Sequence, residues 1–185
     1  MPRRGLTRAA VVETAARVAD RDGYDALTLG AVAAEAGVRA PSLYNHVDGL
    51  AGLRRELALS GLAALGERLR DAAVGRAGDD ALFGLAAAYR AYARAHPGVY
   101  GALQRAPDPG DEEVAAAGGR LLEPVFAVLR GFGLEGDAAI HAARALRSAM
   151  HGFVELERVS GFGIDLDVDE SYRFLIGSMA AGIRA

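Results

Sequence analysis

The sequence predicts an all-α protein, built from a small N-terminal domain of three helices and a larger C-terminal helical bundle. Apolar residues recur at the three- and four-residue spacing of amphipathic helices along most of the chain. No run with the two-residue spacing of a strand is long enough to build a sheet, and glycines and prolines fall between the helical runs. We therefore expect one domain over residues 1–48 and a second over residues 49–185.

The chain has 185 residues, a formal net charge of −3 and no cysteine. A net negative chain does not coat nucleic acid through bulk charge, although it can carry a local basic face. There is no apolar stretch of transmembrane length and no signal-peptide core, so we expect a cytoplasmic protein without disulfides. A basic arm over residues 1–6 and cations near the first three helices supply a local basic face: Arg3, Arg4, Arg8, Arg39, Arg54 and Arg55.

In each of the first two predicted helices a threonine stands before the helix and a glycine after it. Thr7 and Thr28 are placed to accept hydrogen bonds from the amides of the first turn. Gly23 and Gly37 are placed to end the helices, because glycine adopts the left-handed backbone conformation at low cost. The first helix is predicted to end near residue 22 and the second at residue 36.

Polar and aromatic residues follow Gly37, where a core helix would be apolar. Pro41 suits the first turn of a third helix, and Leu43 and Val47 share its inward face at a four-residue spacing. Two short helices joined by a glycine turn, the second with a polar outer face, form the helix-turn-helix plan. We call residues 38–46 the recognition segment. Its side chains predicted to project to solvent are Ser42, Tyr44, Asn45 and His46.

The helices of the C-terminal half follow from the same signals. Pro97 opens a short helix, because the residue before proline resists the helical conformation and proline suits the first turn. Pro124 is expected to kink the helix that contains it. The predicted segments are a long helix that begins at residue 48 and carries leucines as far as residue 69, a break at 75–79, a helix that stops at residues 96–97, a short helix at 97–103, a loop at 106–110, and helices at 111–130, 136–160 and 167–184.

The helix predicted over residues 136–160 has two apolar faces, so it needs two partners. One partner is the core of its own domain. The other is most simply a second copy of the chain, in a symmetric interface where the same patch meets itself. With the last helix it would form a four-helix dimer seam. The residues that we assign to this interface are Leu146, Phe153, Leu156, Tyr172, Leu175, Ile176 and Met179.

The run from Ala33 to His46 has the pattern A-x-x-A-G-V-x-x-x-x-L-Y-x-H and leads through an apolar residue into a long helix. Over residues 7–57 the chain resembles the DNA-binding domain of the TetR family of bacterial repressors. The stretch MHGFVELE at residues 150–157 is similar to the WHG-type ligand-binding domain of part of that family, with Met150 in place of the tryptophan. The resemblance implies a homodimeric repressor that binds a near-palindromic operator and is released by a small-molecule effector.

The same resemblance implies roles for the recognition segment, with Tyr44 and His46 mainly at phosphates. Asn45 has the short amide that pairs with N6 and N7 of adenine. Ser42 can reach a base edge or a phosphate, and Arg39 can read guanine or bind phosphate. The residues that we assign to DNA binding are Thr28, Arg39, Ala40, Pro41, Ser42, Tyr44, Asn45 and His46.

Two positions depart from the family pattern. Leu50 stands where many relatives carry a lysine, and Gly30 stands where others have a base-contacting side chain. One phosphate contact and one base contact are therefore expected to be missing. We expect affinity for DNA to depend more on Arg54, Arg55 and the N-terminal arginines, with a salt dependence dominated by those residues.

Polar-tipped aromatic residues recur on consecutive helices of the C-terminal half. They suit a cavity with an apolar wall and a few hydrogen bonds, although each alone is also typical of a helical core. His151 and Glu155 lie one turn apart, but a buried imidazole paired with a carboxylate is commoner than a metal site, so no metal and no cofactor are expected. The residues that we assign to an effector pocket are Tyr89, Tyr92, Tyr100, Phe126, Met150 and His151.

Two other classes of function stay open. The sequence has no glycine-rich phosphate loop, no HExxH motif and no nucleophile elbow, so enzyme activity is not indicated and a helical hydrolase is the less favoured alternative. A dimeric interaction module that has lost DNA binding, through Leu50 and Gly30, is the other. The sequence specifies neither the effector nor the operator, and it leaves repression and activation both open.

Overall fold

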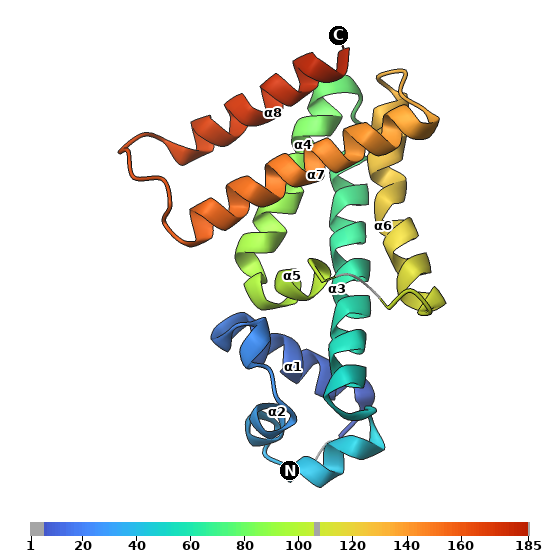
Figure 1. Cartoon of the computed structure of the whole chain (residues 1–185), viewed down its shortest axis with the longest axis vertical. Coiled ribbons are helices and arrows are strands. Elements are labelled where there is room, and N and C mark those ends of the chain that lie inside the picture. The colour runs from blue at the N-terminus through green and yellow to red at the C-terminus, as the bar shows by residue number, and fades with distance from the viewer. Residues whose placement is uncertain (1–5, 106–107, 185) are drawn as a thin grey trace. The chain divides into compact units, whose positions relative to one another are not determined.

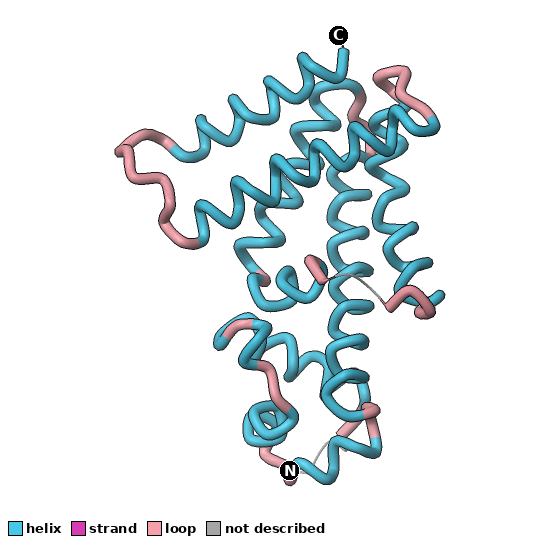
Figure 2. Tube along the Cα trace, viewed as in Figure 1, coloured by secondary structure: helices cyan, strands magenta, loops and turns pink. Residues whose placement is uncertain are grey.

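The computed structural model describes residues 6–105 and 108–184, and every regular element within these ranges is a helix, as Figures 1 and 2 show. The predicted all-α class is confirmed. Arg3, Arg4 and most of the predicted N-terminal arm, and residues 106–107 of the predicted loop, lie outside the described residues. The helices are α1 (Arg8–Asp22), η1 (Tyr24–Ala26), α2 (Leu29–Ala36), η2 (Ala40–Asn45), α3 (Gly49–Ala73), α4 (Gly78–Ala95), α5 (Pro97–Leu103), α6 (Glu112–Arg130), α7 (Gly136–Arg158) and α8 (Val168–Arg184).

The chain divides into two compact units. The first comprises Met1–Ala64 and His96–Gly118, and the second comprises Leu65–Ala95 and Gly119–Ala185. Helices α3 and α6 each continue from one unit into the other. The domain boundary after residue 48 stays a prediction. Among the described residues, no helix combines the length and the apolar character that crossing a membrane requires.

In the first unit, α1 packs against α2 and α5. The contact with α5 depends on Gly98, since a Cβ there would lie 2.0 Å from the carbonyl oxygen of Ala19. One carboxylate oxygen of Asp20 accepts hydrogen bonds from the amides of Gly98 (2.9 Å) and Val99 (3.0 Å). This caps α5 and fastens it to α1. The apolar side chains of this unit with no exposed surface are Val11, Ala15, Val18, Ala19, Leu27, Val32, Leu43, Leu53 and Leu57.

In the second unit, α4 packs against α7 and α8. Its inner face is apolar and aromatic except for one charged residue, Arg90, whose side chain is buried with them. Tyr172 of α8 is also buried, and its hydroxyl donates a hydrogen bond to the carbonyl oxygen of Ala86 on α4 (2.8 Å). The larger apolar side chains buried in this unit are Leu65, Leu69, Leu82, Leu85, Tyr89, Tyr92, Val128, Leu129, Leu146, Phe153, Val154, Tyr172 and Ile176.

Candidate functional site

The turn before the recognition segment is held by capping residues at both ends of α2. The Thr28 hydroxyl accepts from the amide of Ala31 at 3.1 Å, as the sequence predicts. Gly37 has φ 67° and ψ 31°, the left-handed conformation, and its amide donates to the carbonyls of Ala33 and Ala34. The Val38 amide also donates to Ala33. The chain therefore leaves α2 in one defined direction.

The recognition segment forms a six-residue 3-10 helix, η2, rather than a longer helix. Its hydrogen bonds span three residues, from the amide of Ser42 to the carbonyl of Arg39 and from His46 to Leu43. Leu43 has no exposed surface and Val47 is 3% exposed, so these two side chains anchor the segment as predicted. The 3-10 helix has Pro41 in its first turn and ends at Asn45, because His46 (φ −124°, ψ −26°) already leaves helical geometry.

Most of the side chains assigned to DNA lie on the outer surface of this helix turn. Tyr44 is 62% exposed, so its ring and hydroxyl are available to a partner. Asn45 and Arg39 are also exposed, and Ser42 and His46 are half-buried. The remaining residues assigned to DNA binding are Thr28 and Pro41, which are exposed, and Ala40, which is half-buried.

The arginines around the recognition segment are arranged differently from the expectation. Arg55 is bound to carboxylates of its own chain, with Nη2 2.9 Å from Oδ1 of Asp111 and 2.7 Å from Oε2 of Glu113. The hydrogen bonds that Arg55 donates to Asp111 raise the pKa of Arg55 further above its usual value. The guanidinium of Arg54 stacks over the ring of Tyr24 at 5.2 Å, and its Nε is buried without a hydrogen-bond partner. Both guanidinium groups are therefore already engaged within the chain, and a dominant role of Arg54, Arg55 and the N-terminal arginines in phosphate binding stays a prediction.

Arg8 is also engaged. Its Nε donates to the backbone carbonyl of His46 at 3.1 Å, and its Nη1 lies 3.3 Å from a carboxylate oxygen of Glu56. The interaction with His46 reaches the last turn of the recognition segment, where carbonyls lack helical partners and a cation is favourable. Of the cations predicted for the basic face, Arg39 is the one on the recognition segment itself and is exposed.

The residues assigned to an effector pocket do not all lie in one unit. Tyr100 is buried on α5 in the first unit, while the others belong to the second. Tyr89 and Tyr92 are buried on α4, and the guanidinium of Arg68 stacks over the ring of Tyr92 at 5.4 Å. Phe126 on α6 and Met150 and His151 on α7 are half-buried. A pocket built from the last five residues stays a prediction.

The residues assigned to a dimer interface divide into two groups. Leu146, Phe153, Tyr172 and Ile176 are at most 9% exposed in one chain, so they have almost no surface left to give to a partner. They belong to the core of the second unit, because α4 covers that face of α7 and α8. The other three, Leu156, Leu175 and Met179, retain exposed surface. Apolar side chains that the assignment omitted and that are exposed on α7 and α8 are Ile140 and Phe174.

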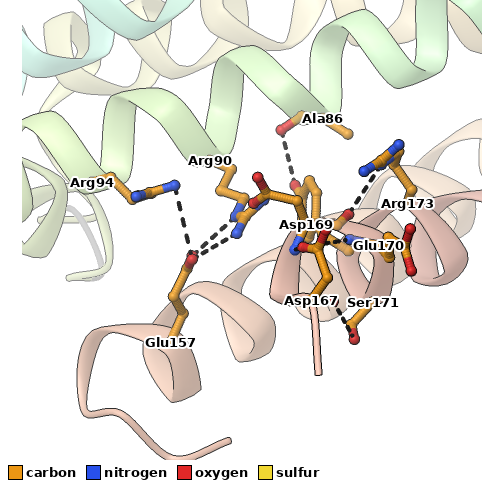
Figure 3. Close-up of polar contacts among 10 residues, drawn as sticks. Ala86, Arg90, Arg94, Glu157, Asp167, Asp169, Glu170, Ser171 and Arg173 are labelled. Carbon is orange, nitrogen blue, oxygen red and sulfur yellow. Dashed lines mark hydrogen bonds and ion pairs between the residues drawn. The ribbon is translucent and has the colours of Figure 1, made fainter. Parts of the chain in front are cut away.

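The sequence-based assignment missed the polar cluster around Arg90, which Figure 3 shows between α4 and the helices α7 and α8. Nε and Nη2 of Arg90 donate to the two carboxylate oxygens of Glu157 at 2.9 and 2.6 Å, and Nη1 lies 2.8 Å from Asp169. The Arg90 guanidinium also lies 4.8 Å from the centre of the Tyr172 ring. Hydrogen bonding to Glu157 raises the pKa of Arg90, and burial raises that of Tyr172. The sequence does carry a signal for this cluster, since Arg90 lies among the apolar residues of the buried face of α4. A charged side chain at a core position needs a partner of opposite charge.

Comparison with known proteins adds family and fold evidence. A family model described as bacterial regulatory proteins, tetR family, matches residues 11–57, and one described as tetracyclin repressor-like, C-terminal domain, matches residues 82–179. The chain is 43% identical over 179 residues to the HTH-type transcriptional regulator Rv0681 of Mycobacterium tuberculosis, covering 96% of this chain and 82% of that one. It is 38% identical over 183 residues to the HTH-type transcriptional regulator YobS of Bacillus subtilis, covering 98% and 95% of the two chains.

Among solved structures, a TetR variant from Acinetobacter baumannii in complex with minocycline superimposes with a TM-score of 0.71 over 96% of each chain. Its sequence identity to this chain is 22%, so the likeness is one of fold.

Proposed function

The chain belongs to the TetR family of bacterial regulatory proteins and is a DNA-binding transcriptional regulator, and from this premise we propose that it acts in the cytoplasm as a homodimeric repressor. In this proposal each subunit places its recognition segment in one half of a near-palindromic operator. A small-molecule effector then releases the protein from DNA. The family is one of transcriptional regulators and not of enzymes, which disfavours the hydrolase alternative.

The observation that carries the proposal is an exposed polar segment on an apolar anchor. Leu43 and Val47 are buried, while Tyr44 and Asn45 between them face outward. The capped helix α2 and the left-handed Gly37 fix where the segment starts. A side chain that reads DNA must be held on a rigid support at the surface, and this arrangement provides one.

Within the segment, side-chain chemistry separates base contacts from phosphate contacts. Asn45 is suited to accept from N6 and donate to N7 of an adenine in the major groove. Tyr44 and His46 are assigned to phosphates, because their single donors position the protein without reading sequence. Arg39 can pair with guanine or hold a phosphate, and Thr28 and Ser42 can support either kind of contact.

Exposed apolar surface on α7 and α8 supports the homodimer. Phe174 is 79% exposed, and Leu156, Leu175, Met179 and Ile140 also keep surface available. Large apolar side chains exposed on neighbouring helices are typical of an interaction site. Two identical subunits related by a two-fold axis would match an operator with two half-sites about 34 Å apart.

An aromatic and apolar set of side chains in the second unit supports the effector. Tyr89, Tyr92, Phe126, Met150 and His151 belong to three helices of that unit. The structural neighbour from Acinetobacter baumannii binds minocycline, which is consistent with a small organic effector for this fold and does not identify it. The effector must favour one spacing of the two recognition segments over another, because a ligand that binds both states equally shifts nothing.

The test begins with selection of bound duplexes from a random library by the purified chain, at two salt concentrations and with the mass of the free protein measured. We expect a dimer to enrich an inverted repeat. Asn45→Ala should then weaken binding to the selected duplex about 10- to 100-fold, the effect of losing one bidentate base contact. Tyr44→Ala should weaken it because the tyrosine no longer reaches a phosphate. Arg130→Gln, at an exposed position of α6, is the control and should bind like the wild type.

Two results would count against the proposal. Unchanged binding by both recognition-segment variants, with the dimer intact, would show that these residues do not read DNA. Weak, salt-sensitive binding that enriches no sequence, with candidate effectors absent, would favour a dimeric interaction module.

A further inference from the structure

A series of charged contacts within the first unit connects the recognition segment to the start of α6. Arg8 binds the backbone carbonyl of His46 and the carboxylate of Glu56. Glu56 also lies 3.7 Å from Nη1 of Arg55. Arg55 in turn holds Asp111 through two hydrogen bonds, from Nε and from Nη2. We call Arg8, Glu56, Arg55 and Asp111 the relay.

The relay is firmest where it reaches α6. The side chain of Asp111 is 15% exposed and meets the planar guanidinium of Arg55 at two points, which fixes direction as well as distance. The same carboxylate accepts from the amide of Val114 at 3.1 Å and so caps the first turn of α6. One side chain therefore anchors the relay and the helix together.

The other end of the relay is looser. Arg8 is 62% exposed, and its ion pair with Glu56 is the kind that contributes little to stability. Its Nε nevertheless holds the carbonyl of His46, and His46 is the residue at which η2 ends. A small displacement there would change the direction in which Asn45 and Tyr44 point.

We propose that the relay positions the recognition segment, so that Arg8 and Arg55 act on DNA affinity through the chain's own carboxylates and not as phosphate ligands. This inference rests on the proposed role of the recognition segment. It makes Glu56 and Asp111, two acids, residues that promote DNA binding. Helix α6 continues as one helix to Arg130, and so the relay also ties the recognition segment to an element shared by both units.

The sign of the effect distinguishes this proposal from simple electrostatics. Removing an acid from a DNA-binding domain should strengthen binding if its charge acts only by repelling phosphate. If the relay positions the segment, Asp111→Asn and Glu56→Gln should instead weaken binding, about fivefold each. Asparagine keeps a side-chain oxygen that can cap α6, so Asp111→Asn removes the charge and retains the cap.

The experiment measures binding of the full chain to the duplex that the wild type selects, over a series of salt concentrations. A matched set of substitutions compares Arg8→Gln and Arg55→Gln with Arg39→Gln, which lies on the recognition segment. A variant that no longer neutralises one phosphate should show a slope of log K against log salt reduced by about 0.9. We expect the Arg8→Gln and Arg55→Gln variants to bind DNA more weakly than the wild type, with an unchanged slope. We expect the Arg55→Gln, Asp111→Asn double variant to bind no more weakly than either single variant, because both substitutions break the same contact.

Tighter binding by Asp111→Asn and Glu56→Gln, or a slope reduced in Arg8→Gln and Arg55→Gln, would overturn the proposal and leave the repressor assignment intact. Failure of that assignment has a different result, namely undiminished affinity in Asn45→Ala. Thermal unfolding of each variant identifies any that does not fold, and Glu56→Gln then carries the test if Asp111→Asn fails.

Discussion

The two units of this chain each contain an arginine held by carboxylates, but the two clusters differ in burial. Arg90 of the second unit has a side chain that is 10% exposed, and it lies against the rings of Phe153 and Tyr172. Arg55 of the first unit is 36% exposed, and the partners of its guanidinium are the carboxylates of Asp111, Glu113 and Glu56. The same arginine–carboxylate pairing therefore lies in the core of the second unit and near the surface of the first.

This difference separates a role in folding from a role in positioning. A buried charge cannot be solvated if its partner is removed, so the cost of breaking the pair is large. A pair with one partner near the surface is replaced in part by water, so breaking it costs less stability and mainly releases a constraint on geometry. We expect the Arg90 cluster to determine whether the second unit folds, and the relay to determine how the recognition segment is held.

The largest effect should come from Arg90→Met, which keeps much of the apolar stem and removes the charge. Glu157 would lose its bidentate partner between α4 and α7, and we expect the free energy of unfolding to fall by about 3 kcal/mol. Urea unfolding of wild type and variant measures this. Arg94→Met is the matched control, because Arg94 approaches the same carboxylate at 3.9 Å from a side chain that is 62% exposed (Figure 3). An equal fall in the free energy of unfolding in Arg90→Met and Arg94→Met would show that burial of the arginine does not determine its contribution to stability.

A smaller effect should come from Tyr172→Phe in the same cluster. The substitution keeps the ring beside Arg90 and removes the hydroxyl that donates to Ala86, so one buried hydrogen bond between α8 and α4 is lost. We expect a loss of about 1 kcal/mol in the free energy of unfolding. Tyr44→Phe, at an exposed position, should leave stability unchanged. A Tyr172→Phe protein as stable as the wild type would mean that the cluster depends on its charges and rings alone.

The fold followed from the sequence because its signals are local. Capping threonines and helix-ending glycines determine where α1 and α2 begin and end, and Thr7, Thr28 and Gly37 act as predicted. Helical periodicity gave the remaining helices, with α7 ending at Arg158 rather than residue 160. The recognition segment was also recognisable, because a polar and aromatic outer face on an apolar anchor is visible within residues 41–47.

What could not be predicted depends on contacts between residues far apart in the chain. Arg55 was expected to bind phosphate, and nothing near it in sequence indicates Asp111 as its partner. Periodicity placed Leu146 and Phe153 on an apolar face but could not say whether α4 or a second subunit covers it. The cap that Asp20 provides for α5 is likewise invisible until α1 and α5 are packed together.

The smallest effect is the pH dependence of the stability that Asp111 of the relay contributes. The hydrogen bonds from Arg55 hold the pKa of Asp111 below its ordinary value. The Asp111 carboxylate therefore takes up a proton less readily in the folded chain than in the unfolded chain, where the pKa of an aspartate is about 3.9. The contribution of this carboxylate to stability is therefore complete above about pH 4 and is lost as the pH falls through the lower folded value. Wild type should be more stable than Asp111→Asn near neutral pH, and the gap should narrow in acid, at about pH 3, as urea unfolding under both conditions would show. A gap of equal size at the two pH values would mean that Asp111 stabilises the unit through its hydrogen bonds and not its charge, so that the relay would not depend on ionisation at all.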